Sequence, residues 1–252
     1  MAAIGFLYGL LVYVFFLATF FYAIGFVGNL PQLPKTIDSG ASAPLLEALL
    51  VNFGLLGLFA VQHSVMARRG FKRWWTRIVP EYVERSTFVL AATAVLALLL
   101  WQWRPIAEPL IWNVEHPVGR VALHLLFWSG WAGLLISTFL INHFEMFGLR
   151  QVLARLLGRR VASQEFRTPL FYRHVRHPIY VGFVIAFWST PQMSAGHLLF
   201  AVATTGYIFV GIWFEERDLI AQFGARYQAY REQVGMLFPR PRKGRRQGHA
   251  GS

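Results

Sequence analysis

The chain has 252 residues, of which 56% are hydrophobic and only 14% are charged. Soluble globular domains carry about 25% charged residues, so the composition indicates a membrane protein. The net charge of +12 could suggest a nucleic-acid-binding protein, but the basic residues lie between apolar runs, where membrane proteins place them. The sequence contains no cysteine, which excludes disulfides, a cysteine nucleophile and Cys-ligated metal centres.

Stretches without Asp, Glu, Lys or Arg mark the expected membrane spans, and they are 1–34, 48–67, 86–103, 121–144 and 177–214. The first has no basic n-region, which predicts a retained transmembrane helix rather than a signal peptide. Each of the first four suits one span of about 20 residues. The fifth would extend about 57 Å as one helix, nearly twice the bilayer core, so a turn is expected at Thr190–Gly196.

These runs predict an all-α, polytopic membrane helical bundle of five to six spans, with the fifth span short. If the hairpin only dips into the membrane, four full spans remain. The successive loops and the tail contain 1, 6, 2, 7 and 8 basic residues, with the uncharged hairpin turn before the last. The positive-inside rule then places both termini and the basic loops in the cytoplasm of a bacterial cytoplasmic (inner) membrane protein.

The segments that follow the spans indicate three regions. We expect an N-terminal transmembrane bundle over 1–144, a catalytic region over 145–239 and a basic disordered tail over 240–252. Within the second region a short helix is expected at 149–157. An apolar face continues the last helix beyond Phe214 and consists of Leu219, Ile220, Phe223, Tyr227 and Tyr230.

Two charged clusters flank the hairpin. The first contains Arg173, Arg176, His177 and Tyr180, with Pro178 at a helix start whose free N–H groups favour an anion. The alternative is that these side chains are interfacial anchors. The second cluster, Glu215–Asp218, could bind hydroxyls, an amine or a sulfonium, or could pair with the arginines. Both clusters open on the same membrane side, so a pocket between them is plausible.

Two further histidines lie near the cytoplasmic ends of spans, His63 in the second and His143 in the fourth. Polar residues at membrane depth are costly and tend to be functional, although a structural role is about as plausible for each. No histidine pair has zinc spacing with a third ligand, so no metal site is expected.

The motifs Arg176-His177-Pro178-x-Tyr180-x-Gly182, Glu215-Glu216 and Phe223-Gly224-x-x-Tyr227 resemble the integral-membrane superfamily of isoprenylcysteine carboxyl methyltransferases and phospholipid methyltransferases. Nearly the whole chain is similar to bacterial methanethiol S-methyltransferases. The motifs that carry this likeness are Gln62-His63-Ser64, Glu84-Arg85, Asn142-His143-Phe144-Glu145 and Phe166-Arg167-Thr168-Pro169. The resemblance implies transfer of a methyl group from S-adenosyl-L-methionine to methanethiol, giving dimethyl sulfide.

The resemblance also implies a set of cofactor contacts. They are Gln164, Glu165, Phe166, Tyr172, Arg176, His177, Pro178, Ile179, Tyr180, Glu215 and Glu216. The carboxyl methyltransferase has an arginine just before its acidic pair, where this chain has Ile212-Trp213-Phe214. That difference favours an uncharged thiol over a carboxylate acceptor.

Methyl transfer to sulfur needs alignment and a thiolate, so we expect a general base. His143 is the first candidate, oriented by Glu145, and His63 is the second. The expected partners are a small thiol and the lipid bilayer, with no nucleic acid and no obligate protein partner. Two alternatives stay open. One is methylation of a lipid or prenyl thiol or carboxylate, and the other is a non-enzymatic small transporter or accessory protein.

Overall fold

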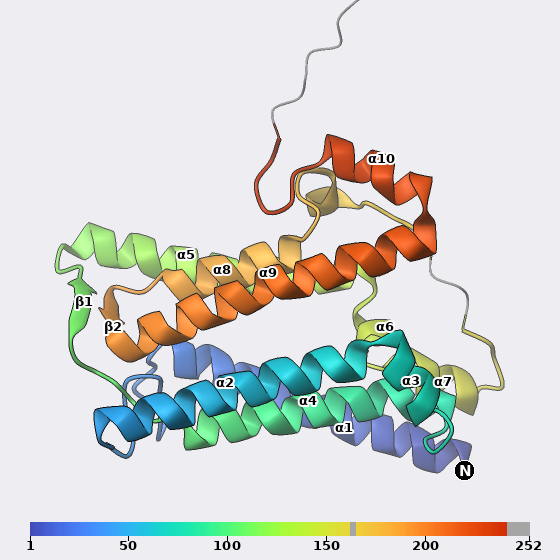
Figure 1. Cartoon of the computed structure of the whole chain (residues 1–252), viewed down its shortest axis with the longest axis horizontal. Coiled ribbons are helices and arrows are strands. Elements are labelled where there is room, and N and C mark those ends of the chain that lie inside the picture. The colour runs from blue at the N-terminus through green and yellow to red at the C-terminus, as the bar shows by residue number, and fades with distance from the viewer. Residues whose placement is uncertain (162–164, 241–252) are drawn as a thin grey trace, which may run out of the picture.

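The computed structural model describes residues 1–161 and 165–240, so the tail predicted beyond residue 240 and Gln164 lie outside the described residues. Within that part of the chain, five helices are long and apolar enough to cross a membrane. They are α1 (Ala2–Val27), α2 (Leu45–Ala67), α4 (Glu81–Gln102), α5 (Pro117–Ile141) and α9 (Ala195–Phe223), as Figure 1 shows. The protein is a multi-pass, all-α membrane protein, as its composition predicted.

The shorter elements connect these helices at the two ends of the bundle. They are α3 (Arg69–Trp75), α6 (His143–Met146), α7 (Leu149–Leu156), the 3₁₀ turn η1 (Leu170–Arg173), α8 (Pro178–Trp188), α10 (Ala225–Gln233), and the strands β1 (Leu110–Asn113) and β2 (Gln192–Ser194). In Figure 1, α3, α7 and α10 lie at one end and the two strands at the other. The segments rich in arginine and lysine therefore share one end, as the alternation of charge predicted.

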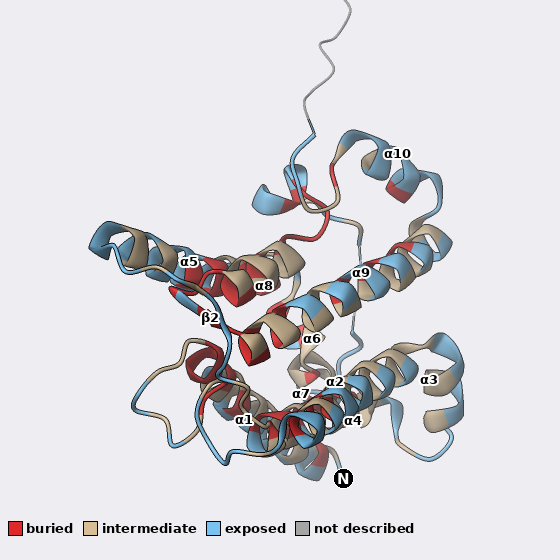
Figure 2. Ribbon diagram, turned by 60° about the vertical axis from the view of Figure 1, so that its left-hand side comes forward, coloured by how far each residue is buried: buried red, intermediate tan, exposed pale blue. Residues whose placement is uncertain are grey.

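The long helices form two layers. One contains α1, α2 and α4, with α7 packed against α1, and the other contains α5, α8 and α9 (Figures 1 and 2). Aromatic side chains join the layers at the end that carries the strands. Trp103 packs edge-on against Phe26 of α1 and Phe200 of α9, with ring centroids 6.5 and 5.8 Å apart. The indole N–H of the fully buried Trp103 donates to the carbonyl of Ile37 at 3.0 Å.

Two glycines allow α5 and α8 to touch along their backbones. A Cβ atom on Gly130 would lie 2.8 Å from the carbonyl oxygen of Gly182, and one on Gly182 would lie 2.6 Å from that of Gly130. Without a hydrophobic driving force between helices in lipid, close packing at small residues is the main source of helix association. This contact fixes the start of α8, and with it the polar residues that precede it.

The predicted hairpin turn is confirmed. Helix α8 starts with Pro178 at its first position and ends at Trp188, so its 11 residues extend about 16 Å, too short to cross the bilayer alone. The chain then reverses through β2, and the hydroxyl of Ser194 caps α9 by accepting from the backbone N–H of His197 at 2.9 Å. Helix α9, with 29 residues, is long enough for a full span. The described part of the chain thus contains five helices long enough to span a membrane and one short apolar helix.

The structure adds one feature that the sequence did not predict and corrects another. First, β2 pairs antiparallel with β1 from the loop between α4 and α5, a pairing that short segments without alternation do not reveal. Second, the last helix does not continue beyond Phe223. Gly224 has φ +55°, a conformation that favours glycine, and the chain turns there before α10 starts. The apolar face from Leu219 to Tyr230 is therefore divided between two helices.

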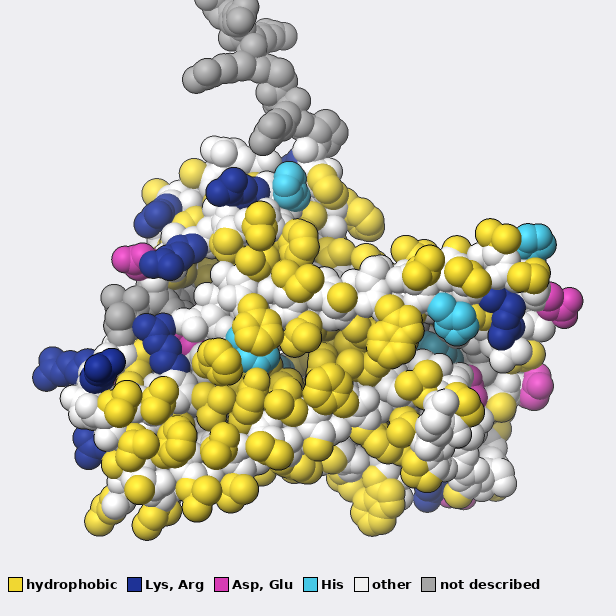
Figure 3. All heavy atoms as spheres, turned by 180° about the vertical axis from the view of Figure 1, so that it is seen from behind, with side chains coloured by type: hydrophobic (Ala, Val, Ile, Leu, Met, Phe, Trp, Pro, Cys, Tyr) yellow, Lys and Arg dark blue, Asp and Glu magenta, His cyan; other side chains and the backbone are white. Residues whose placement is uncertain are grey.

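The outer surface along the bundle is apolar, in keeping with a lipid environment. Large hydrophobic side chains such as Leu50, Phe53, Leu125 and Val210 are exposed. Figure 3 shows hydrophobic side chains across the middle of one face, with lysine and arginine gathered mostly towards the end that bears the N-terminus and α10, on the left in that view. A soluble protein rarely exposes apolar patches of this extent.

Candidate active site

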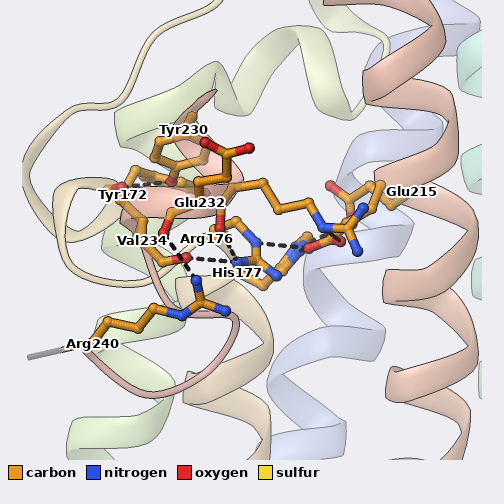
Figure 4. A network of polar contacts seen from close by, with 10 residues as sticks. Tyr172, Arg176, His177, Glu215, Tyr230, Glu232, Val234 and Arg240 are labelled. Carbon is orange, nitrogen blue, oxygen red and sulfur yellow. Dashed lines mark hydrogen bonds and ion pairs between the residues drawn. The ribbon is translucent and has the colours of Figure 1, made fainter. Parts of the chain in front are cut away.

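A network of buried charges joins the start of α8 to α9. Nε of Arg176 donates to Oε1 of Glu216 at 2.7 Å, and Nε2 of His177 lies 3.1 Å from the same oxygen (Figure 4). The other carboxylate oxygen of Glu216 lies 3.2 Å from Nε of Arg231 on α10. We call Tyr172, Arg176, His177, Glu215, Glu216, Tyr230 and Arg231 the polar cluster.

The turn at Gly224 brings α10 back over the polar cluster. The hydroxyl of Tyr230 donates to the carbonyl of Tyr172 at 2.6 Å. The backbone N–H groups of Arg176 and His177 donate to the carbonyls of Gly235 and Met236 at 2.8 and 3.2 Å. The residues before α8 and those after α10 thereby form one unit that shields the ion pairs from water.

Tyrosines around the polar cluster stay protonated to high pH. Burial, reinforced by the charge of Glu216, raises the pKa of Tyr230 to about 12, against the opposing effect of Arg176. Burial and the charge of Glu215 raise the pKa of Tyr172 well above the usual range. Burial and the charge of Glu216 do the same to the pKa of Tyr227. These phenols are hydrogen-bond donors at physiological pH.

Tyr180 lies on the first turn of α8 beside the polar cluster. Its ring centroid lies 5.6 Å from that of His177. The Tyr180 hydroxyl faces Gly211 of α9, where a Cβ atom would be 3.8 Å away. Glu215 is partly exposed and lies 3.6 Å from Nδ1 of His177. Tyr180 and the acidic pair, which lie on two separate segments of the sequence, thus all lie next to His177.

Phe166 packs against aromatic residues of α9 and α10, including Tyr230 of the polar cluster. Its ring packs against Phe223, Tyr227 and Tyr230 with centroids 5.3 to 5.9 Å apart. Its neighbour Glu165 points to solvent and pairs with Arg167 at 2.8 Å, and this contact lowers the pKa of the Glu165 carboxyl. Phe166 therefore lies against the helix that covers the polar cluster, whereas Glu165 makes its contact outside it.

Pro178 and Ile179 have structural positions at the start of α8. Pro178 is buried at the first helical position, where a missing N–H leaves no hydrogen bond unmade. Ile179 packs against the main hydrophobic core. Both fix the direction of the chain that carries Arg176, His177 and Tyr180.

The two histidines singled out in the sequence have different surroundings. Both ring nitrogens of His143 are occupied, Nε2 by the hydroxyl of Tyr13 at 2.7 Å and Nδ1 by that of Thr138 at 2.8 Å. Its ring stacks on Phe139 at 4.1 Å, and burial lowers its pKa. Glu145, which we expected to orient His143, is bonded instead to Arg150 at 2.5 Å and to Asn142.

His63 lies between the two layers. Its ring stacks on Phe59 at 5.4 Å and lies 5.1 Å from Phe88 and 6.4 Å from Tyr207 of α9. The buried Nδ1 atom has no hydrogen-bond partner among the described residues. Tyr207 and Ser64 share a hydrogen bond of 3.0 Å that links α2 to α9.

Sequence reasoning did not single out Arg231 or Tyr207, and it named Arg85 only as part of a motif of the resemblance, without a role. Tyr207, Gly211 and Glu215 are spaced four residues apart, so they share one face of α9. That spacing was readable in the sequence, but the helix on which this face packs was not. No group of three or more His, Asp or Glu side chains converges as a metal site requires within residues 1–161 and 165–240.

Comparison with known proteins gives close relatives over nearly the whole chain. Methanethiol S-methyltransferase of Mycobacterium tuberculosis is 57% identical over 237 residues, which cover 94% of this chain and 96% of that protein. Methanethiol S-methyltransferase 1 of Bradyrhizobium diazoefficiens is 54% identical and covers 94% and 82% of the two chains. Nurim of Bos taurus is 29% identical over 69% of each chain. No family model and no solved structure matches.

The match covers almost the full length of both chains at high identity. The chain belongs to the methanethiol S-methyltransferase family.

Proposed function

We propose that the protein transfers a methyl group from S-adenosyl-L-methionine to methanethiol and releases dimethyl sulfide. Family membership supports the reaction class and the acceptor. The observation that carries the proposal is the polar cluster itself, in which Arg176, His177 and Glu216 form a charged site at the membrane end that bears the basic loops.

The residues of the polar cluster fit such a cofactor. Arg231 is half-exposed beside Glu216 and can hold a carboxylate. The carboxylate of Glu215 is 44% exposed and can accept from an amine or from ribose hydroxyls. The hydroxyl of Tyr227 is buried without a partner in the described chain, which leaves a donor for a polar ligand. Among the motif residues, Tyr172, Phe166 and Tyr180 supply aromatic surface around these charges, and Gln164 and Glu165 are assigned by resemblance.

When bound, S-adenosyl-L-methionine supplies an electrophilic methyl group on a sulfonium. The protein contributes alignment, which can be worth about 7–11 kcal/mol, and excludes water under α10. A simple alkyl thiol titrates near or above the cysteine value of about 8.5, so a group that accepts its proton accelerates the reaction at neutral pH. Of the two candidate bases, the geometry favours His63, because the ring nitrogens of His143 both have protein partners.

The charge distribution supports an orientation in the membrane. We place the end with α3, α7 and α10, and both termini, in the cytoplasm of a bacterial inner membrane, because basic loops stay on that side. The charged cofactor then enters from the cytoplasm, whereas methanethiol and dimethyl sulfide are small and apolar enough to pass through lipid. The regions 1–144, 145–239 and 240–252 are proposed as bundle, catalytic region and tail.

The direct test is headspace detection of dimethyl sulfide after purified protein in nanodiscs receives methanethiol and S-adenosyl-L-methionine. Cofactor binding is measured separately by calorimetry on the same sample. We expect product with the wild type and none without the cofactor. A wild-type sample that binds no S-adenosyl-L-methionine, or that binds it and forms no methylated thiol, contradicts the proposal.

A further inference from the structure

Arg85 on α4 is a partly buried cation that has no ion-pair partner among the described residues. Its Nε donates to the carbonyl of Met146 at 2.6 Å, and its guanidinium carbon lies 4.9 Å from the ring centre of Phe88. Within the described part of the chain, no carboxylate oxygen lies within 4.0 Å of the guanidinium. A buried charge is costly unless it is paired, so this arrangement needs a reason.

His63 contacts the ring of Phe88, the same ring that Arg85 contacts. Its imidazole centroid is 5.1 Å from that of Phe88, and its buried Nδ1 atom has no hydrogen-bond partner within residues 1–161 and 165–240. Phe59 and Tyr207 enclose the imidazole further. A proton acceptor and a cation therefore share one largely apolar environment.

The charges around this pair are mostly positive. Arg68 and Lys72 approach from α2 and α3, and burial together with the charge of Arg85 lowers the pKa of Lys72. The acids that face this group are Glu84, Glu145 and Asp218. Asp218 pairs with Arg68 at 3.4 Å and lies 3.8 Å from Arg69, and Glu145 pairs with Arg150. Glu84 has no ion-pair partner among the described residues. With Arg69 and Arg150 included, cations outnumber carboxylates in this region, which favours a small anion.

The pair is connected to the polar cluster along α9. Tyr207 touches His63, Gly211 follows one turn later against the hydroxyl of Tyr180, and Glu215 comes next. Tyr207 and Glu215 are eight positions apart on this helix, a rise of about 12 Å. A cofactor held at Glu215 can thus extend towards His63 along this face.

We propose that Arg85 and His63 form the site for the acceptor thiol, with His63 as the base and Arg85 as the cation that holds the thiolate. This assignment depends on the methyltransferase function proposed above. The thiol proton moves to the free ring nitrogen of His63, and sulfur keeps the electron pair. That pair forms the new sulfur–methyl bond as the donor's sulfonium–methyl bond breaks, and the electrons of the broken bond neutralise the sulfonium. The enclosing rings of Phe59, Phe88 and Tyr207 restrict the site to small apolar thiols.

The experiment compares two small thiols of different acidity, methanethiol and 2,2,2-trifluoroethanethiol, with wild type, Arg85→Gln, Arg85→Met and Arg85→Lys. Arg85→Met keeps an apolar stem over Phe88 in case Arg85→Gln fails to fold. The readouts are kcat/KM from pH 6 to 9 and the Kd of S-adenosyl-L-methionine. Arg77→Gln removes an exposed arginine at the same end of the bundle and is the matched control.

Loss of the charge should lower kcat/KM for methanethiol by about tenfold or more at pH 7, because a thiol without a neighbouring cation ionises less. Cofactor Kd should stay unchanged, and the activity should recover as pH rises. The kcat/KM for the fluorinated thiol should fall much less, because this thiol ionises at lower pH without a neighbouring cation. Arg85→Lys should retain most activity, and Arg77→Gln should match the wild type.

Three results would overturn the assignment. Equal losses for both thiols would indicate a structural role for Arg85, weakened cofactor binding would place it in the cofactor site, and an unchanged rate would exclude it from the reaction. His63→Asn should likewise lose more kcat/KM for methanethiol than for the fluorinated thiol. If Arg85→Gln and Arg85→Met are both unfolded, this comparison on His63→Asn tests the assignment, and equal losses for the two thiols would overturn it. A wild type that methylates neither thiol overturns the proposed function itself, before any variant is compared.

Discussion

The carboxylate of Glu216 accepts a hydrogen bond from Nε of Arg176 across 2.7 Å, although 40 residues separate the two in the chain. Both side chains are almost fully buried, with exposed fractions of 9% and 6%. The contact fastens the start of α8 to the end of α9 at the point where the charged cofactor is proposed to bind. Its removal should therefore affect binding and folding together.

Glu216→Gln should weaken S-adenosyl-L-methionine binding by at least tenfold. The variant leaves Arg176 and His177 without their shared anion, and uncompensated buried charge costs about 3–5 kcal/mol. Calorimetric Kd and the melting temperature of the nanodisc sample measure the two effects. Glu232→Gln, an exposed acid on the same helix as Arg231, serves as control. Wild-type affinity in Glu216→Gln would remove this carboxylate from the cofactor site.

The two histidine variants should separate catalysis from stability. His63→Ala should lower kcat for methanethiol by about 10²-fold, the usual effect of losing a general base, with little change in melting temperature. His143→Ala should lower the melting temperature and spare most of kcat, because His143 loses bonds to Tyr13 and Thr138 and a stacked ring. The reverse pattern would make His143 the base.

Tyr230 should give the folded protein a sensitivity to alkaline pH. Its pKa is raised to about 12, so the folded state keeps a proton that the unfolded chain releases near pH 10. The resulting stabilisation is complete below pH 10 and is lost as pH rises towards 12. Melting temperatures across this window should fall more steeply for the wild type than for Tyr230→Phe. Parallel curves would show that Tyr230 does not titrate as a buried donor.

A pair of glycines on α5 tests the contact with α8. Gly130→Ala forces a Cβ atom to within 2.8 Å of backbone atoms of α8, whereas Gly133→Ala meets nothing within 4 Å. Overpacking of this kind costs about 1–3 kcal/mol, so Gly130→Ala should lower the melting temperature and Gly133→Ala should not. Equal behaviour of the two variants would mean that α5 and α8 are held by other contacts.

Much of the fold follows from local properties of the sequence. Uncharged runs predicted the spanning helices, and the length of the run from 177 to 214 required the turn at Thr190–Gly196 that the structure contains. Pro178 fixed the start of α8 for a reason internal to the residue, its missing N–H. These features depend on segment length, hydropathy and local backbone geometry, all of which can be read from consecutive residues of the sequence.

The partner of each polar side chain is a property of the tertiary structure. The sequence left open whether Arg176 was an interfacial anchor or paired with the acids, and gave no sign that Arg231 of α10 would join them. It also could not reveal that His143 has both nitrogens occupied while His63 shares Phe88 with Arg85. Such contacts join helices that are far apart in the chain. Local periodicity specifies which face of a helix is apolar, but it does not specify which other helix covers that face. The packing of the helices in three dimensions therefore decides these contacts.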